Sequence, residues 1–177
     1  DYRNIRLSTK TIDVFPFSSA RKSMITVIEA GGPGMVRIHI KGASELLLNA
    51  CKKWLRSNGK EEIINADDLR NLRRFIAEMA EESLRTIAVA YREMTIAQCE
   101  KRPEDGPPLE NLTLIALFGI EDPLRLGVPE AVSQCQNAGI FIRMVTGDNV
   151  ITAQAIARKC GILMRGGIVM EGPRFRE

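Results

Sequence analysis

Two short, mainly apolar runs with few polar residues stand near the start of the chain. Residues 24–28 (MITVI) and 36–40 (VRIHI) are rich in β-branched residues, and the glycine-rich segment 31–34 (GGPG) separates them. Strand-forming runs joined by a short glycine-rich loop are typical of a β-hairpin. In the second run every other residue is apolar, so we expect one face of that strand to be buried. We therefore expect residues 1–42 to be β structure.

The apolar spacing then changes to three and four residues. This spacing predicts a helix over residues 44–55, which the Asn58-Gly59 pair would stop, and a second amphipathic helix over residues 67–83. The acidic pair that begins the second helix suits a helix N-terminus. Residues 86–91 are predicted to form a buried strand, whereas the proline-rich residues 98–111 are expected to form a surface loop.

Strands and helices alternate in the last third of the chain. The pattern predicts a strand, a helix, a strand and a helix over residues 112–120, 128–137, 140–145 and 150–159. Such alternation with short links is typical of a parallel sheet covered by helices. We therefore predict an α/β chain with a first domain at residues 1–117 and a second domain at residues 118–177.

Composition narrows the possible functions. Of the 177 residues, 45% are hydrophobic and 27% are charged, which is the balance of a globular protein. The formal net charge of +3 is too small, and the basic residues are too dispersed, to indicate a nucleic-acid partner. A single histidine and four cysteines without a C-x-x-C pair argue against a zinc site, so we assign no metal ligands. No apolar run approaches the roughly 20 residues that cross a bilayer.

The segment 143–149 (RMVTGDN) carries the strongest chemical signal. An apolar strand would end in Thr146-Gly147-Asp148 where a helix begins, and open α/β sheets bind ligands at the carboxyl ends of their strands. Free N–H groups at a helix start suit a phosphate. The Thr146 hydroxyl can donate to a phosphoryl oxygen, Gly147 lets the backbone approach, and Asp148 can act near a magnesium ion. Asp148 and Asn149 can equally serve only as a helix cap, and the tripeptide alone leaves both interpretations open.

Two further segments combine a candidate ligand contact with a simpler structural explanation. Phe17 precedes Lys22 by five residues, so the ring can stack on a purine while the ammonium group neutralises phosphate. Lys41 ends a predicted strand and Gly42 follows it, which leaves room for a phosphate chain beside the lysine. A core phenylalanine, a solvated basic turn and a plain strand-to-helix turn explain the same residues, and each segment alone favours that simpler explanation.

Arg85 and Asp122 form a further candidate pair. Arg85 follows the second predicted helix, and Asp122 lies in the segment EDPLR near the predicted domain boundary. Arginine favours bidentate contacts with phosphate or carboxylate, and Pro123 stiffens the chain beside Asp122. A solvated surface charge and a plain turn are the alternative explanation.

Taken together and in this order, these segments resemble the cation-transporting P-type ATPases. The resemblance covers essentially the whole chain, and its motifs are FSSARKSM at 17–24, KGA at 41–43, LRT at 84–86, DPLR at 122–125 and TGDN at 146–149. The details most similar to the plasma-membrane-type, autoinhibited calcium pumps are KGASE at 41–45, RMVTGDN at 143–149, KCGIL at 159–163 and EGP at 171–173. Ser19 stands where the family often has an arginine, so one phosphate contact is lost or supplied elsewhere.

The resemblance implies a role for each candidate residue of the first domain and for Asp122, the partner of Arg85. Residues 1–117 would be the C-terminal part of the nucleotide-binding domain, in which the family's adenine-stacking phenylalanine matches Phe17. The lysines of the ATP pocket match Lys22 and Lys41, with Gly42 beside them. The family's arginine that reaches the phosphates and pairs with the hinge aspartate matches Arg85, and Asp122 matches that aspartate.

For the second domain the resemblance implies catalysis. Residues 118–177 would be part of the phosphorylation domain, which has a Rossmannoid, haloacid-dehalogenase-like fold. Thr146, Gly147 and Asp148 would face the transferred phosphoryl group and its magnesium ion. The motif with the phosphorylated aspartate and the later magnesium-binding motif are both absent from the chain. The resemblance places them before residue 1 and after residue 177, so we expect this chain alone to be inactive.

The implied activity is the coupling of ATP hydrolysis, through an aspartyl phosphate, to calcium transport across a membrane. ATP and Mg²⁺ would be the cofactors. The partners would be the membrane helices and the actuator domain of the same pump and, in the autoinhibited subgroup, a calmodulin-binding tail. The chain would lie at the cytoplasmic face of a membrane, with the plasma membrane favoured over the vacuolar and endoplasmic-reticulum membranes.

Three alternatives stay open from the sequence. The chain can be a non-catalytic nucleotide-binding or interaction module, such as a docking surface for an autoinhibitory tail. It can also belong to a pump for another cation, because ion ligands would lie in membrane helices that the chain lacks. A soluble haloacid-dehalogenase-like phosphatase is disfavoured, because the Asp13-Val14-Phe15 segment has no second aspartate two residues after the first.

Overall fold

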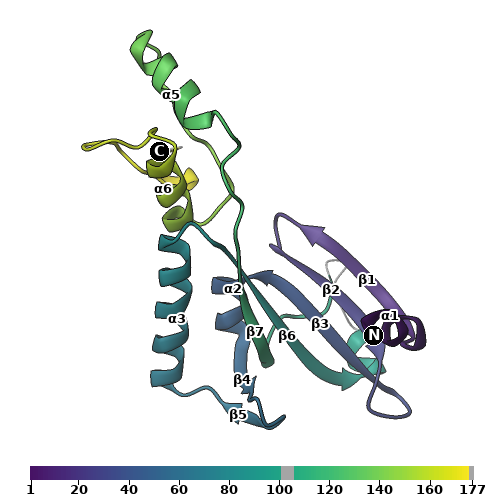
Figure 1. The fold of residues 1–177 in the computed structure, drawn as a ribbon. Helices are drawn as coiled ribbons and strands as arrows, with labels where there is room; N and C mark the ends of the chain where they lie inside the picture. Colours follow the sequence, from purple (N-terminus) through teal and green to yellow (C-terminus); the bar gives the residue numbers. More distant parts are fainter. Residues whose placement is uncertain (101–105, 176–177) are drawn as a thin grey trace. The chain divides into compact units, whose positions relative to one another are not determined.

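The computed structural model describes residues 1–100 and 106–175, and the chain folds into two compact units (Figure 1). The first unit comprises residues 1–72 and 87–118, and the second comprises residues 73–86 and 119–177. Within the described part, no helix is both long and apolar enough to cross a membrane. The division into consecutive domains at residue 117 stays a prediction.

A seven-stranded sheet has the strand order β1-β2-β3-β6-β7-β4-β5. Its strands are β1 (Thr11–Ser18), β2 (Ser23–Glu29), β3 (Met35–Ala43), β4 (Cys51–Leu55), β5 (Glu61–Ile63), β6 (Arg85–Thr95) and β7 (Leu112–Ile120). β1 to β2, β2 to β3, β3 to β6 and β4 to β5 pair antiparallel, whereas β4 and β7 pair in parallel. The predicted α/β class is confirmed, with a mostly antiparallel sheet. The haloacid-dehalogenase-like assignment of residues 118–177 stays a prediction.

The core of the first unit lies on one face of this sheet. β2 and β3 pair from Ser23 opposite Gly42 to Glu29 opposite Val36, which confirms the predicted hairpin. The alternation in β3 buries every second side chain, as predicted. Apolar side chains of this unit that are at most 2% exposed come from β2, β3, β6, β7 and α2 (Ser44–Ala50), and they are Ile25, Val27, Val36, Ile38, Ile40, Leu47, Leu48, Ala88, Ala90 and Leu112.

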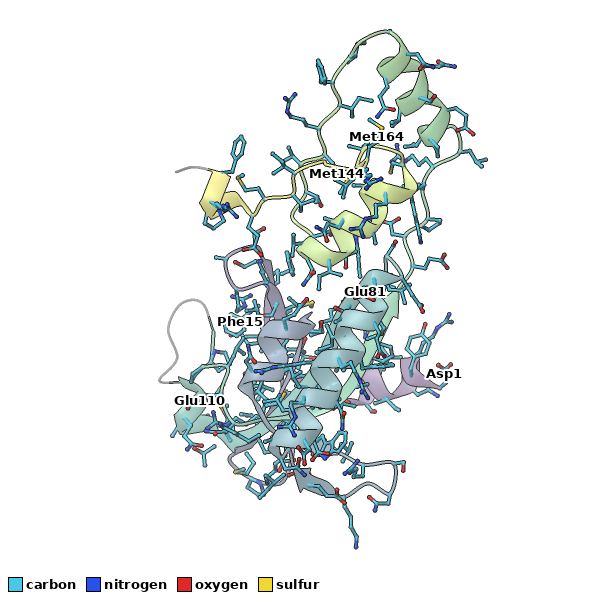
Figure 2. The ribbon with its side chains drawn as sticks, turned by 90° about the vertical axis from the view of Figure 1, so that its left-hand side faces the viewer. Asp1, Phe15, Glu81, Glu110, Met144 and Met164 are labelled. Carbon is cyan, nitrogen blue, oxygen red and sulfur yellow. The ribbon has the colours of Figure 1, made fainter. Side chains whose placement is uncertain are left out.

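α3 (Ala66–Glu81) confirms the second predicted helix. Asn65 Oδ1 accepts hydrogen bonds from the backbone N–H groups of Asp67 and Asp68, each at 2.9 Å. Asp68 in turn accepts one from Asn65 N at 3.1 Å, so the two side chains satisfy free donors at the helix start. The helix buries Ile76 and ends at Glu81, which Figure 2 labels. β6 then contains the predicted strand 86–91 and is longer at both ends.

The second unit contains both helices predicted after residue 120. They are α5 (Val128–Asn137) and α6 (Val150–Lys159), and a short helix, α7 (Gly172–Phe175), lies near the C-terminus. Gly127 precedes α5 with φ 83°, a left-handed conformation that glycine adopts without strain. Pro129 lies in the first turn of α5, where the missing N–H group of a proline costs no helical hydrogen bond.

The first two predicted elements are corrected by the structure. Residues 2–8 form helix α1 (Tyr2–Ser8) and not β structure, because Asp1 caps it by accepting from Arg3 N at 3.0 Å. The helix predicted over residues 44–55 ends at Ala50, and β4 begins at Cys51. Gly59, with φ 79°, supplies a hairpin turn between β4 and β5 and not a helix stop. Pairing of β4 with β7, distant in sequence, outweighs the local helical periodicity.

Two later predictions are also corrected. Residues 140–145 form no strand, and Phe141 and Val145 are 87% and 96% exposed. A strand exists only as part of a hydrogen-bonded ladder, and no described strand pairs with this segment. Within the predicted loop 98–111, α4 (Ile96–Glu100) extends to residue 100, and Gly106 is buried against Phe15, which Figure 2 labels. Residues 101–105 lie outside the described part of the chain.

A polar network ties the β4–β5 hairpin to β6. The Tyr91 hydroxyl donates to a carboxylate oxygen of Glu61, and Lys53 Nζ lies 2.9 Å from the other oxygen. The Arg37 guanidinium stacks over the Tyr91 ring at 4.9 Å. The hydrogen bond from Tyr91, followed by the one from Lys53, lowers the pKa of Glu61. The ionised form of Glu61 therefore stabilises the fold.

Replacing Tyr91 with Phe is expected to reduce the pH dependence of stability in acid. Because the folded-state pKa of Glu61 lies below its ordinary value of 4.5, its contribution is present above that pH and is lost as the pH falls through the folded-state pKa. Tyr91→Phe removes the strongest cause of the shift. Its free energy of unfolding, from urea titrations, should fall below wild type at neutral pH and converge with it in acid. The matched control is Tyr2→Phe in exposed α1, and an equal loss at every pH would contradict the role of Glu61.

Candidate functional site

The four predicted contacts of the first unit lie at one end of strands β1 to β3. Phe17 is near the end of β1, Lys22 is in the turn between β1 and β2, and Lys41 and Gly42 are near the end of β3. The Lys22 carbonyl accepts a hydrogen bond from Ala43 N at 3.0 Å. The structure therefore brings together the backbones of Lys22 and Ala43, which are 21 positions apart in the sequence. We call this set, Phe17, Lys22, Lys41 and Gly42, the β1–β3 corner.

Gly42 allows the corner to close. A Cβ atom at this position would lie 2.5 Å from the Lys22 carbonyl oxygen, 2.7 Å from Ser23 Cβ and 2.9 Å from Leu47 Cδ1. The space that a side chain would fill is therefore occupied by the protein itself. Lys22 has φ 51°, a left-handed conformation that is uncommon outside glycine. The turn that carries Lys22 is thus seated directly on the glycine.

The corner presents an exposed aromatic ring and two cations. Phe17 is 65% exposed, so the ring is not a core side chain. Lys22 and Lys41 are exposed, and neither forms an ion pair within residues 1–100 and 106–175. An exposed aromatic ring and unpaired ammonium groups at the same end of a sheet suit a ligand with a flat ring and negative charge. The core-phenylalanine explanation of Phe17 is therefore wrong.

Arg85 bridges two carboxylates in the second unit. Its Nη1 lies 3.2 Å from Asp122 Oδ2 and its Nη2 lies 3.2 Å from Asp148 Oδ2. The Asp148 side chain is 20% exposed, whereas those of Arg85 and Asp122 are about half exposed, at 49% and 56%. The bridge joins the start of β6, the segment after β7 and the loop before α6. Three candidates from distant parts of the sequence therefore meet.

The Thr146-Gly147-Asp148 segment forms the turn that leads into α6. Thr146 Oγ1 accepts from Asp148 N at 3.1 Å, and nothing lies within 4 Å of where a Gly147 side chain would begin. The cap of α6 is Asn149, whose Oδ1 accepts from Ile151 N at 2.8 Å. The helix-cap interpretation thus holds for Asn149, and the Asp148 carboxylate is directed to Arg85 instead.

The described residues do not by themselves fit a magnesium ion. No group of three His, Cys, Asp or Glu side chains that can hold a metal occurs within residues 1–100 and 106–175. Asp148 offers one carboxylate, and that carboxylate pairs with Arg85. Magnesium is usually held by one or two carboxylates together with waters and substrate phosphates, so Asp148 would supply one ligand of an incomplete set.

Two residues of α6 for which no role was predicted contact the segment between α3 and β6. Thr152 Oγ1 donates to Leu84 O at 3.1 Å, and Lys159 Nζ donates to Glu82 O at 3.1 Å. The one signal available in the sequence is Thr152, which is polar and lies in an alanine-rich stretch whose other polar residue before Arg158 is Gln154. Its partner is a backbone carbonyl, and residue type does not reveal such a contact.

Comparison with known proteins gives one family and many similar chains. The model of the P-type ATPase cytoplasmic domain N matches residues 1–127. The chain is 45% identical over 176 residues to "Calcium-transporting ATPase 2, plasma membrane-type" of Arabidopsis thaliana, which covers 99% of this chain and 17% of that protein. It is 44% identical to "Calcium-transporting ATPase PAT1" of Dictyostelium discoideum, with 100% and 15% covered. The rice protein "Calcium-transporting ATPase 10, plasma membrane-type" is 43% identical, with 100% and 17% covered.

The share of each relative that the chain covers limits which of the relative's properties can be assigned to this chain. The chain spans less than a fifth of the length of each of these three relatives. Their similarity extends over essentially the whole chain, past the end of the family model at residue 127. The activity of a whole relative therefore cannot be assigned to this chain by identity alone.

Replacing Gly42 with Ala is expected to destabilise the first unit by about 1–3 kcal/mol, the usual cost of an overpacked site. The added methyl group would meet the Lys22 carbonyl, which cannot move without disturbing the turn. The measurement is the urea concentration at the midpoint of unfolding, compared between variants whose free energy of unfolding depends on urea with the same slope. The control is Gly172→Ala, where nothing lies within 4 Å of the new Cβ, and it should change little. Equal effects of the two substitutions would show that close packing at Gly42 is unimportant.

Proposed function

The chain belongs to the P-type ATPases, and we propose that it is the ATP-binding part of a member that transports calcium. The match of the nucleotide-domain model to residues 1–127 supports an ATP-binding role. The calcium assignment is supported by the names of relatives that are 43–45% identical over the whole chain. Transport itself would be carried out by membrane helices of the same pump.

The β1–β3 corner is the proposed adenosine and phosphate site. Phe17 would stack on adenine, because its exposed ring has a free apolar face. Lys22 and Lys41 would neutralise the phosphates, because no carboxylate pairs with either ammonium group in the described residues. Gly42 would hold the turn that carries Lys22 in place. The observation that carries the proposal is an exposed ring and two unpaired cations at the same end of strands β1 to β3, within the part of the chain that matches the family model.

The Arg85 bridge is the proposed link to phosphoryl transfer. Arg85 would reach the phosphates, Asp122 would act as its hinge partner, and Thr146 to Asp148 would face the transferred phosphoryl group. Catalysis of phosphoryl transfer consists mainly of positioning and charge neutralisation, which these groups can supply. The nucleophilic aspartate and a complete magnesium site would come from other parts of the pump. We therefore propose that this chain alone does not form an aspartyl phosphate.

The remaining assignments follow from the same proposal. Residues 1–117 would be the C-terminal part of the nucleotide-binding domain, and residues 118–177 part of the phosphorylation domain. The partners would be the membrane helices, the actuator domain and an autoinhibitory calmodulin-binding tail. The chain would face the cytoplasm beside the plasma membrane.

Titration of the chain with ATP, followed by amide NMR, tests the corner. We expect the signals of residues around Phe17, Lys22 and Lys41 to shift with a Kd on the order of 1 mM, equivalent to about −4 kcal/mol. Phe17→Ala should weaken binding about tenfold, because one base-stacking contact contributes roughly 1–3 kcal/mol. Lys41→Ala should weaken the binding of ATP more than the binding of adenosine, since it removes a phosphate contact.

Matched controls separate these effects from general damage. Phe141→Ala removes an 87% exposed ring of the second unit, and Lys60→Ala removes an exposed lysine of the β4–β5 turn. Both variants should bind ATP as wild type does. A well-dispersed spectrum that does not respond to ATP would refute the proposal. Binding of an autoinhibitory tail without nucleotide would then favour an interaction module.

A further inference from the structure

The turn that follows α3 adopts a conformation that needs support. Ser83 N donates to Ala80 O at 2.9 Å and Leu84 N donates to Met79 O at 3.0 Å, which ends the helix. Ser83 has φ 71° and is 8% exposed. A residue other than glycine in the left-handed region is strained, and it persists only where its surroundings hold it there. We call residues 82–85 the α3–β6 turn.

One stripe of α6 supplies that support. Asp148, Thr152 and Lys159 are separated by four and seven residues, so they lie on one face of the helix and its N-terminal extension. Asp148 pairs with the side chain of Arg85, Thr152 donates to the carbonyl of Leu84, and Lys159 donates to the carbonyl of Glu82. The contacts run in opposite order along the two segments. The turn is therefore held at three points along an antiparallel neighbour.

The other side of the turn packs on β7. A Cβ atom at Gly119 would lie 2.9 Å from Leu84 Cδ1 and 3.1 Å from Met79 Sδ, so the glycine permits this close approach. Three residues later Asp122 reaches Arg85. Because the turn is fixed from both sides, the direction in which the Arg85 side chain leaves the backbone is fixed as well.

We propose that Thr152 and Lys159 are positioning residues for Arg85. A threonine within a helix usually bonds a carbonyl of its own helix, whereas Thr152 is 2% exposed and bonds a carbonyl 68 residues away in the sequence. Lys159 in the last turn of α6 would ordinarily be solvated, yet it reaches Glu82 O at 3.1 Å. Together they orient the α3–β6 turn so that the Arg85 guanidinium meets both carboxylates. The consequence for ATP rests on the proposed function, but the positioning of Arg85 does not.

Rotation of the Arg85 guanidinium about its Nε–Cζ bond gives a direct readout. We would follow it by NMR of the arginine side chains of the full chain, with the Arg85 signal assigned by Arg85→Lys. Thr152→Val keeps the shape of the side chain and removes its donor, so Arg85 should rotate about three- to tenfold faster, as the loss of one net hydrogen bond predicts. Thr152→Ser keeps the hydroxyl and should behave as wild type does.

Two matched controls make the result specific. Thr113 is another buried threonine, 5% exposed in β7, and Thr113→Val should leave the Arg85 rotation unchanged even if it lowers stability. Lys159→Met should accelerate the rotation, whereas Arg158→Met, which removes the adjacent exposed cation, should not. Because Lys159→Met alters a surface side chain, it decides the question if Thr152→Val does not fold. Wild-type rotation in folded Thr152→Val and in Lys159→Met would overturn the proposal.

A titration with MgATP separates this inference from the proposed function. If both hold, Thr152→Val should bind ATP about threefold more weakly than Thr152→Ser does, again the effect of one hydrogen bond. If wild type binds no ATP, the proposed function fails, and the rotation of Arg85 still decides whether Thr152 and Lys159 position it. If wild type binds ATP and the rotation is unchanged in both variants, the positioning role alone fails.

Discussion

The close packing at Gly42 is the constraint on which the first unit depends. The turn between β1 and β2 can close against the end of β3 only because no side chain stands between the Lys22 carbonyl and the Leu47 side chain. This contact holds the backbone of Lys22 against the end of β3, where Lys41 lies. Both lysines are exposed at the edge of the buried core. The same glycine therefore fixes the turn that carries Lys22, on which the proposed ATP site depends.

The candidate cations of the two units differ in their partners. In the first unit, Lys22 and Lys41 have no ion-pair partner within the described residues, so they are ready for an anion. In the second unit, Arg85 already bridges Asp122 and Asp148. The half-exposed Asp122 carboxylate can be exchanged for a phosphate at little electrostatic cost, because its pair with Arg85 is screened by water. The first arrangement suits binding, and the second suits a contact that changes during a reaction.

The sequence predicted the elements whose signals are local. Strands β2 and β3 and helices α5 and α6 follow from alternation, periodicity and glycine-containing turns close to them. The sequence failed at Cys51–Leu55, because pairing with a strand some 60 residues away decides that segment, and at residues 140–145, which have no ladder partner among the described strands. The order of the motifs identified the residues of the corner and of the Arg85 bridge. Thr152 and Lys159 were missed because they contact backbone carbonyls, which are the same for every residue type.

The central claim is that the β1–β3 corner binds ATP through its adenine ring, and intermolecular nuclear Overhauser effects test it most directly. The spectra would be recorded on the chain with Phe17 labelled selectively and ATP near saturation. The account predicts cross-peaks between the ring protons of Phe17 and the H2 and H8 protons of adenine. Cross-peaks from adenine to other side chains only, with none to Phe17, would contradict the account.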